Sequence, residues 1–118
     1  MAYLVFFQCP SHGVRTGAAT FKIEEGIYAY VGSCGASCLK RVDRHLRRPA
    51  ARRWHVDYLR CEGLYAVVTP LKEVEVAKLL AGRCRHVPGF GSTDDPEAPS
   101  HLFRCGVAEA LSYIGLTT

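Results

Sequence analysis

The segment that decides the fold is residues 27–48, which read IYAYVGSCGASCLKRVDRHLRR. Its first part, residues 27–31, is rich in aromatic and β-branched residues and predicts a strand. From residue 37 onward apolar residues recur at helical intervals, until Pro49 stops the pattern. The apolar stripe of this second part consists of Leu39, Val42 and Leu46. We therefore expect a strand that leads through a short loop into a helix over residues 37–48, with the stripe packed against a sheet.

The rest of the chain repeats these two patterns on both sides of the segment. Apolar or alternating runs bounded by turn residues predict strands over residues 3–8, 19–23, 54–59, 64–69 and 101–105. Helical spacing predicts helices over residues 71–81 and 107–114. A loop rich in Gly, Pro and Asp separates these helices over residues 83–100. We expect the fold class to be α+β, with a small, mostly antiparallel β-sheet flanked by helices.

The composition limits the class of protein. With 118 residues the chain has the length of one domain, so we expect a single domain over residues 1–118. Hydrophobic residues make up 48% and charged residues 22%, which is typical of a soluble globular protein. No apolar run approaches the roughly 18 residues of a membrane span, so we expect no membrane partner. The opening residues 1–7 read as a strand rather than as a signal peptide, which favours an intracellular protein.

The positive charge is concentrated in one segment. Residues 40–53 hold seven of the fifteen Lys and Arg residues and one Asp, so this segment carries +6 and the rest of the chain carries −2. A basic segment of this density is typical of surfaces that bind the phosphate backbone of nucleic acids. A solvated helix face is the alternative interpretation. The candidate nucleic-acid-binding residues are Lys40, Arg44, Arg47, Arg48, Arg52 and Arg53.

Several segments occur in an order that resembles a known nuclease family. Tyr30-Val31-Gly32-Ser33 ends the predicted strand, and the following helix carries Arg41 and, four residues later, His45. Further matching segments are residues 54–59, 90–92 and 100–103. Together these segments resemble the GIY-YIG nuclease superfamily, in particular its small stand-alone branch of Uri-type endonucleases. The resemblance covers nearly the whole chain and implies a GIY-YIG-like fold and nuclease domain.

The string Gly26-Ile27-Tyr28 spells the first motif of that family but cannot serve as it. Residues 28 and 30 lie on one face of one strand, whereas the family places its two tyrosines on neighbouring strands. We therefore assign the first tyrosine to Tyr3 on the opening strand and the second to Tyr30. The Gly and Ile of the family motif are absent beside Tyr3.

The resemblance implies phosphodiester hydrolysis with one divalent metal ion, Mg²⁺ or Mn²⁺. In that family a tyrosine helps to activate water, which suggests catalytic roles for Tyr3 and Tyr30, and the alternative is that both fill the core. A free tyrosine has a pKa of about 10, and the positive charge of Arg41 is an available means of lowering it. Arg41 can also hold a phosphate through two N–H groups, and His45 can donate a hydrogen bond or transfer a proton.

The resemblance assigns the metal to a glutamate, and helical spacing ranks the candidates. Glu73 shares a helix face with apolar residues that would pack on the sheet, whereas Glu75 aligns with two lysines. We therefore expect Glu73 to be the catalytic carboxylate and metal ligand, with Glu75 and Glu109 as weaker candidates. The alternative is that Glu73 only complements the positive N-terminus of its helix.

The sequence gives less definite roles to two histidines and to an acidic loop. His55 lies in a predicted strand and is a possible active-site neighbour. His101 lies in a segment shared with the Uri-type branch, where the sequence assigns it no role. Asp94, Asp95 and Glu97 occupy the loop in which that branch often has cysteines, which argues against a thiolate metal site there.

The six cysteines give no clear metal or disulfide pattern. They include no C-x-x-C pair, so a zinc module is poorly supported. In an intracellular protein buried free thiols are the default expectation. Disulfides are the alternative, because they are common inside hyperthermophiles, but six cysteines allow 15 pairings and the sequence does not select one.

The leading hypothesis is a metal-dependent DNA endonuclease with a centre of Tyr3, Tyr30, Arg41, His45 and Glu73, and with a basic helix on the DNA backbone. Such a protein would be cytoplasmic and nucleoid-associated, and a homodimer is one route to specificity. The sequence does not distinguish single-stranded, duplex and branched DNA as substrates. The first alternative is a catalytically inactive nucleic-acid-binding module. The second is a small protein-interaction domain whose basic face meets an acidic partner.

Overall fold

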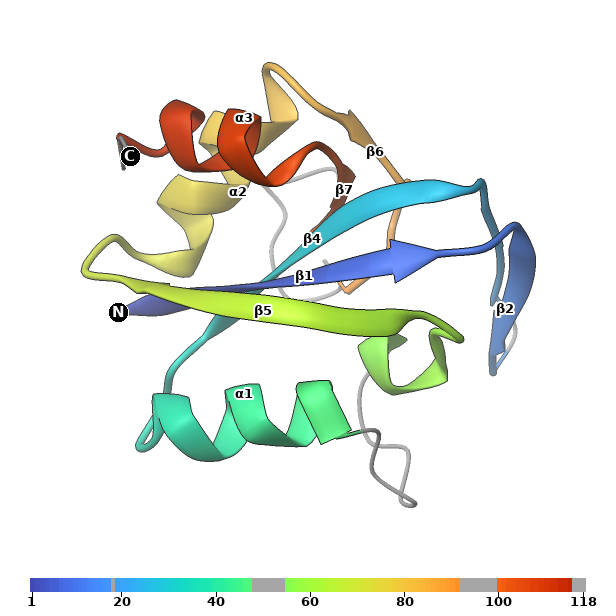
Figure 1. Ribbon diagram of the computed structural model, residues 1–118, viewed down its shortest axis with the longest axis horizontal. Helices are drawn as coiled ribbons and strands as arrows, with labels where there is room; N and C mark the ends of the chain where they lie inside the picture. The colour runs from blue at the N-terminus through green and yellow to red at the C-terminus, as the bar shows by residue number, and fades with distance from the viewer. Residues whose placement is uncertain (18, 48–54, 92–99, 116–118) are drawn as a thin grey trace.

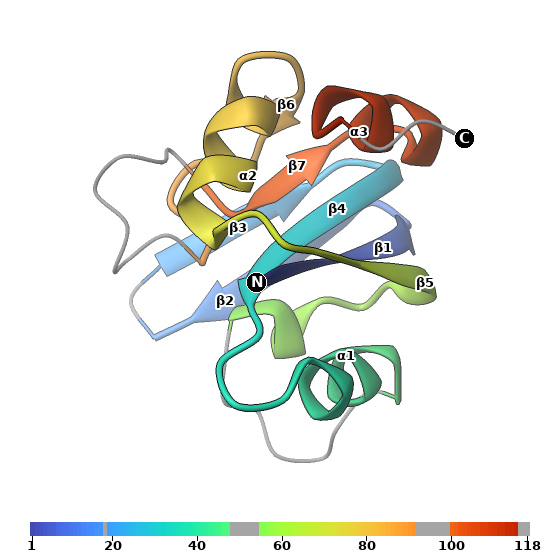
Figure 2. The same ribbon diagram turned by 90° about the vertical axis from the view of Figure 1, so that its left-hand side faces the viewer.

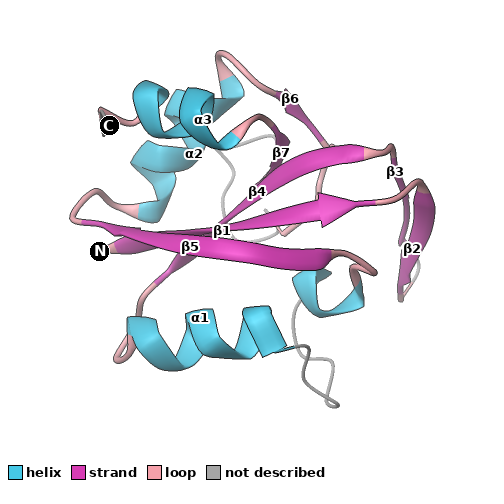
Figure 3. Cartoon of the chain, viewed as in Figure 1, coloured by secondary structure: helices cyan, strands magenta, loops and turns pink. Residues whose placement is uncertain are grey.

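The structure of the chain is a computed structural model that describes residues 1–17, 19–47, 55–91 and 100–115 (Figure 1). The strands are β1 (Ala2–Cys9), β2 (His12–Thr16), β3 (Ala19–Ile23), β4 (Gly26–Ser33), β5 (Glu62–Thr69), β6 (Arg85–His86) and β7 (Leu102–Arg104). The helices are α1 (Cys38–Arg47), α2 (Glu73–Ala81) and α3 (Val107–Tyr113), and η1 (His55–Tyr58) is a short 3₁₀ helix. Figure 3 shows these helices and strands along the chain.

A five-stranded antiparallel sheet in the order β5-β1-β4-β7-β6 forms the middle layer of the fold. β1 pairs with β4 on one side and with β5 on the other. Its sequence, AYLVFFQC, is apolar at almost every position because α1 covers one face of the sheet while α2 and α3 cover the other (Figure 2). The predicted α+β class, with a mostly antiparallel sheet flanked by helices, is therefore confirmed.

The two faces of the sheet carry separate hydrophobic cores. The core on the α1 side includes Tyr3 and Val5 of β1. The core on the side of α2 and α3 includes Leu4 and Phe6. This alternation is the two-residue period of a strand, and it also brings Tyr30 of β4 to the α1 side. Both predicted catalytic tyrosines therefore face the same helix.

β2 and β3 form a separate two-stranded hairpin between β1 and β4. The sequence predicts β3 but not β2, because Pro10, Ser11 and Gly13 give its start the composition of a turn. One face of the hairpin is buried, and the ring of Phe21 lies 5.0 Å from that of Phe90 in an edge-on contact. The hairpin is thus attached to the main sheet by a packed aromatic pair.

The strand predicted over residues 54–59 is wrong. Residue 54 lies outside the described residues, and residues 55–58 form η1. The buried side chains of this segment are Val56 and Leu59, which are three residues apart and therefore share a face of a helical turn. The backbone N–H of Leu59 donates to the carbonyl of Val56 at 3.1 Å and closes the turn.

The apolar stripe predicted for the α1 segment is only partly correct. Leu39 is 80% exposed, whereas Val42 and Leu46 pack against the sheet together with Cys38. His45 is also buried against the sheet and is only 4% exposed. The side of α1 that faces the sheet is therefore rotated relative to the predicted stripe. It is formed by Cys38, Val42 and His45, which follow one another at intervals of four and three residues.

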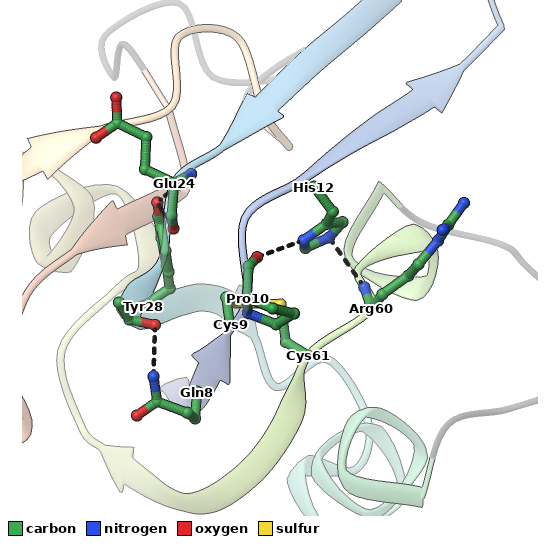
Figure 4. Close-up of a disulfide and its surroundings, with 9 residues drawn as sticks. Gln8, Cys9, Pro10, His12, Glu24, Tyr28, Arg60 and Cys61 are labelled. Atoms are coloured by element: carbon green, nitrogen blue, oxygen red, sulfur yellow. Dashed lines mark hydrogen bonds between the residues drawn. A yellow bond between two sulfur atoms is a disulfide. The ribbon is translucent and has the colours of Figure 1, made fainter.

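The six cysteines form three disulfides, so the default expectation of free thiols is wrong. Cys9–Cys61 joins the end of β1 to the residue before β5, and Figure 4 shows this bond and its surroundings. The other two pairs are Cys34–Cys38 and Cys84–Cys105. The pairs span 52, 4 and 21 residues respectively, so the loops that they close differ widely in length.

We expect the stability of the protein to depend most on Cys9–Cys61. A cross-link across 52 residues restricts the unfolded chain by about 4 kcal/mol, against about 2 kcal/mol for the 4-residue span of Cys34–Cys38. The Cys9→Ser/Cys61→Ser double variant should therefore lose about 2 kcal/mol more unfolding free energy than the Cys34→Ser/Cys38→Ser control, measured by urea denaturation. Equal losses in the two variants would contradict this expectation.

Candidate active site

A cleft of about 470 Å³ opens between the starts of α1 and α2, where β1 begins and β4 ends. The pairing of Ala2 with Ser33 brings these two strand ends together. The cleft is lined by Tyr3, Tyr30, Val31, Gly32, Ser33, Arg41, Lys72, Glu73, Val74, Gly91 and His101. Four of the five predicted catalytic residues thus line one cleft, and the fifth, His45, contacts two of them.

Tyr3 joins β1 to α1 at the floor of the cleft. Its ring lies over Gly32, its partner in the antiparallel register, and a Cβ atom at position 32 would overlap the phenol. The glycine is therefore required for close approach of the ring. The hydroxyl of Tyr3 is hydrogen-bonded to Nε2 of His45 at 2.8 Å. Only 3% of Tyr3 and 4% of His45 are exposed, so breaking this bond would leave buried polar groups unsatisfied.

Tyr30 reaches the cleft from β4 and contacts the other side of the same histidine. The ring centroids of Tyr30 and His45 are 5.6 Å apart in an edge-on arrangement, and those of Tyr3 and His45 are 5.5 Å apart. Gly91 packs against Tyr30, because a Cβ atom there would approach the phenol ring to 3.2 Å. The imidazole of His45 is therefore in contact with both phenol rings.

Arg41 enters the cleft from the first turns of α1. Its Nη1 donates a hydrogen bond to the carbonyl of Ser33, the last residue of β4, at 2.8 Å. Gly35 adopts a φ of 55°, and a Cβ atom there would lie 2.7 Å from Nη2 of Arg41. The first turn of α1 contains no acidic residue. The guanidinium of Arg41 is thus held at the cleft by its hydrogen bond to the Ser33 carbonyl and by its close packing against Gly35.

Glu73, the first residue of α2, faces Arg41 across the same cleft, and its partner is His101. Nδ1 of His101 donates to Oε1 of Glu73 at 3.0 Å. His101 is only 2% exposed. Its backbone N–H donates to the carbonyl of Phe90, and its carbonyl accepts from the N–H of Val31. Sequence reasoning missed this role, and the only signal available was the position of His101 in a segment of the family resemblance.

The residues present fit a magnesium or manganese ion bound by a single carboxylate. The side chain of Glu73 is 28% exposed, and His101 binds one of its oxygens. Mg²⁺ commonly keeps several water ligands and uses one or two carboxylates together with substrate phosphates. The described residues contain no group of three or more His, Cys, Asp or Glu side chains that could enclose a metal. Glu73 would therefore hold such an ion at the open side of the cleft, with His101 orienting its carboxylate.

The other carboxylate candidates lie apart from the cleft. Glu75 is exposed on the far side of α2, as its spacing with the lysines predicts. Glu109 of α3 lines a different pocket, together with Arg83 and Arg104. Asp94, Asp95 and Glu97 lie outside the described residues.

The structure describes three of the six predicted nucleic-acid-binding residues. Lys40 and Arg47 are exposed on α1, and Arg47 forms an ion pair with Asp43 at 2.6 Å. Arg44 is half-buried on the same helix. Arg48, Arg52 and Arg53 lie outside the described residues, as does the side chain of His55, whose backbone is part of η1.

The literal Gly26-Ile27-Tyr28 string lies at the opposite end of β4 from the cleft. The hydroxyl of Tyr28 donates to the carbonyl of Glu24 at 2.8 Å and accepts from the N–H of the same residue at 3.1 Å. Burial raises the pKa of Tyr28, which keeps the phenol protonated. These contacts give Tyr28 a structural role in the turn before β4, in agreement with the assignment of the site tyrosines to Tyr3 and Tyr30.

The chain belongs to the family described as Domain of unknown function DUF123, whose family model matches residues 2–115. No curated protein and no solved structure matches the chain. Over the described residues, none of the helices is long and apolar enough to cross a membrane. The family match covers every residue that lines the cleft.

We expect Gly32 to be essential for the geometry of the cleft. In Gly32→Ala the added methyl group would overlap the Tyr3 ring, so the variant should lose about 1–3 kcal/mol of unfolding free energy. The matched control is Gly13→Ala in β2, where the nearest atom to a Cβ would be the Phe21 carbonyl oxygen at 3.9 Å. Urea denaturation should show less than about 0.5 kcal/mol of change for the control, and a similar loss for both would refute the packing argument.

Proposed function

We propose that this member of the DUF123 family is a metal-dependent DNA endonuclease of the GIY-YIG type. The observation that supports it best is that Tyr3, Tyr30, Arg41 and Glu73 line one cleft although they come from four separate elements. Aromatic residues that merely filled the core would not require a guanidinium and a carboxylate beside them. The proposed substrate is the DNA backbone, and the proposed place of action is the cytoplasm, in association with the nucleoid.

In the proposed reaction a water molecule attacks phosphorus, a P–O bond breaks, and the leaving oxygen takes up a proton from the solvent. The Tyr3–His45 hydrogen bond of 2.8 Å offers a route for the proton of the attacking water. The water passes this proton to the Tyr3 oxygen while the hydroxyl proton of Tyr3 moves to Nε2 of His45. Tyr30, in contact with His45, keeps the imidazole in place and lines the position of the water.

Arg41 is the proposed phosphate-binding residue. Its guanidinium lines the cleft and can donate to two non-bridging oxygens of the phosphate. The same positive charge stabilises the negative charge that grows on these oxygens in the transition state. A Mg²⁺ or Mn²⁺ ion bound at Glu73 would supply charge stabilisation to the leaving oxygen.

The basic residues of α1 extend the proposed DNA contact beyond the cleft. Lys40 precedes Arg41 directly and is exposed, and Arg47 is exposed at the end of the same helix. A duplex or single strand held at Arg41 would therefore meet further positive charge along α1. Binding of this kind weakens steeply as the salt concentration rises.

We expect Glu73→Gln to abolish metal-dependent cleavage while DNA binding is retained. The substitution keeps the size of the side chain but removes the charge that would bind the ion, so cleavage should fall at least about hundredfold. The control is Glu75→Gln, two residues away and exposed, which should cleave like the wild type. The assay incubates labelled single-stranded, duplex and branched DNA with Mg²⁺ or Mn²⁺, and with EDTA in a parallel sample.

The outcomes of this assay separate the proposal from its alternatives. Binding without metal-dependent cleavage by the wild type would support the inactive binding module, and negligible DNA affinity at low salt would support the protein-interaction domain. An equal loss of cleavage in Glu73→Gln and Glu75→Gln would contradict the assignment of Glu73 as the metal ligand.

A second pair of variants tests the tyrosine assignment. Tyr30→Phe should reduce cleavage by at least about tenfold because Tyr30 lines the proposed position of the attacking water, whereas Tyr28→Phe should affect stability and leave cleavage unchanged. The measurement is the single-turnover rate with saturating enzyme, together with the unfolding free energy of both variants. A larger effect on cleavage at Tyr28 would reverse the assignment.

A further inference from the structure

A second positively charged groove lies at the opposite end of the molecule from the cleft. It has a volume of about 410 Å³ and is lined by Gly13, Val14, Arg15, Thr20, Tyr58 and Arg60. These residues come from the β2–β3 hairpin, from η1 and from the residues between η1 and β5. We propose that this groove binds a second phosphate group of a DNA duplex whose first phosphate lies in the cleft. The inference rests on the proposed function.

The charge of the groove supports an anionic ligand. Arg15 and Arg60 are both exposed and line the same groove. Among the side chains that the structure describes, no carboxylate lines it and none forms an ion pair with either arginine. Two guanidinium groups in one groove repel each other, and a bound phosphate would remove that repulsion. Lys22 lies opposite Gly13 in the hairpin register and adds positive charge to the same exposed face.

The backbone of Arg60 is held in place by neighbouring groups, as Figure 4 shows. Its N–H donates to Nε2 of His12 at 3.1 Å, so Nδ1 of His12 carries the ring proton and donates to the carbonyl of Pro10 at 2.7 Å. The next residue, Cys61, forms the disulfide to Cys9. The chain at Arg60 is therefore fixed relative to the start of the hairpin before any ligand binds, which reduces the entropy lost on binding.

The groove and the cleft are close enough for one duplex to reach both. The longest dimension of the molecule is 35 Å, and it is horizontal in Figure 1, where β2 lies at one end and α1 begins at the other. One turn of B-DNA is about 34–36 Å long, so a duplex of little more than one turn extends past both sites. η1 packs into the same core as α1, which places the groove and the basic helix on one side of the sheet.

These features favour a duplex over a single strand. A duplex is stiff over about 150 base pairs, so it can contact the cleft and the groove together without being ordered by the protein. Proteins that hold single strands usually stack bases on exposed aromatic rings. The aromatic residue of this groove, Tyr58, is half-buried and packs against the core on the α1 side. The groove therefore offers charge and little stacking surface.

The test measures duplex binding by fluorescence anisotropy across a range of salt concentrations, in EDTA to prevent cleavage. Two duplexes are compared, of about 8 and about 16 base pairs, because only the longer one spans more than a helical turn. For Arg15→Gln/Arg60→Gln we expect the slope of log affinity against log salt on the longer duplex to fall by about two. The salt slope of the shorter duplex should fall by less.

The matched control is Arg83→Gln/Arg85→Gln, which removes the same charge from the opposite edge of the sheet, at β6, where the two arginines line a separate pocket. It should leave the salt slope and the preference for the longer duplex at wild-type values. A wild-type slope in the groove variant, or an equal loss in the control, would overturn the inference. An equal loss on a single strand of the same length would overturn the assignment to a duplex.

The proposed function and this inference can fail separately. Groove-dependent duplex binding by a wild type that shows no metal-dependent cleavage would support the groove and reject the endonuclease. Metal-dependent cleavage with no effect of the groove variant on binding would support the endonuclease and reject the groove. Circular dichroism and urea denaturation of both double variants establish that the comparison concerns folded proteins.

Discussion

The close approach of Tyr3 to Gly32 in the pairing of β1 with β4 is the constraint on which the cleft depends. Because position 32 has no side chain, the Tyr3 ring can lie across β4 and its hydroxyl can reach Nε2 of His45. That hydrogen bond is buried and joins the sheet to α1, so it determines how the helix sits and hence where Arg41 enters the cleft. A slip of the strands by one residue would turn Tyr3 to the other face of the sheet and remove all of these contacts.

The disulfides support this arrangement from outside the cleft. Cys34–Cys38 spans the loop that contains Gly35, and that loop provides the Arg41 contacts. Cys9–Cys61 fixes the far end of β1 to the approach of β5, next to the hairpin. Three disulfides are unusual for a protein that would act on DNA inside a cell, but intracellular proteins of hyperthermophiles are rich in them. A chain of 118 residues with a modest core gains much from such cross-links.

The elements with a strong periodic pattern could be predicted from the sequence, and those shaped by tertiary contacts could not. β1, β4, β5 and the three helices follow directly from apolar runs and helical spacing. β2 could not be predicted because turn residues lie at its start. The segment of η1 is predicted as a strand because large and polar residues alternate in it over a few positions. In the site, helix spacing correctly selects Glu73 over Glu75 as the residue that reaches the cleft. The role of His101 could not be inferred, because a contact between a helix start and a residue 28 positions later leaves no local pattern.

The charges of the cleft explain why Glu73 and Arg41 belong together. Of the described residues that line the cleft, Glu73 is the only acid, and it faces the cations Arg41 and Lys72. A phosphate that entered the cleft would be attracted by Arg41 and Lys72 but repelled by the carboxylate of Glu73. A divalent cation at Glu73 would reverse that repulsion, so a phosphate and a cation would bind more tightly together than either would alone. His101 is part of this balance, because a neutral imidazole that donates one hydrogen bond orients the carboxylate without cancelling its charge, whereas an imidazolium would compete with the cation.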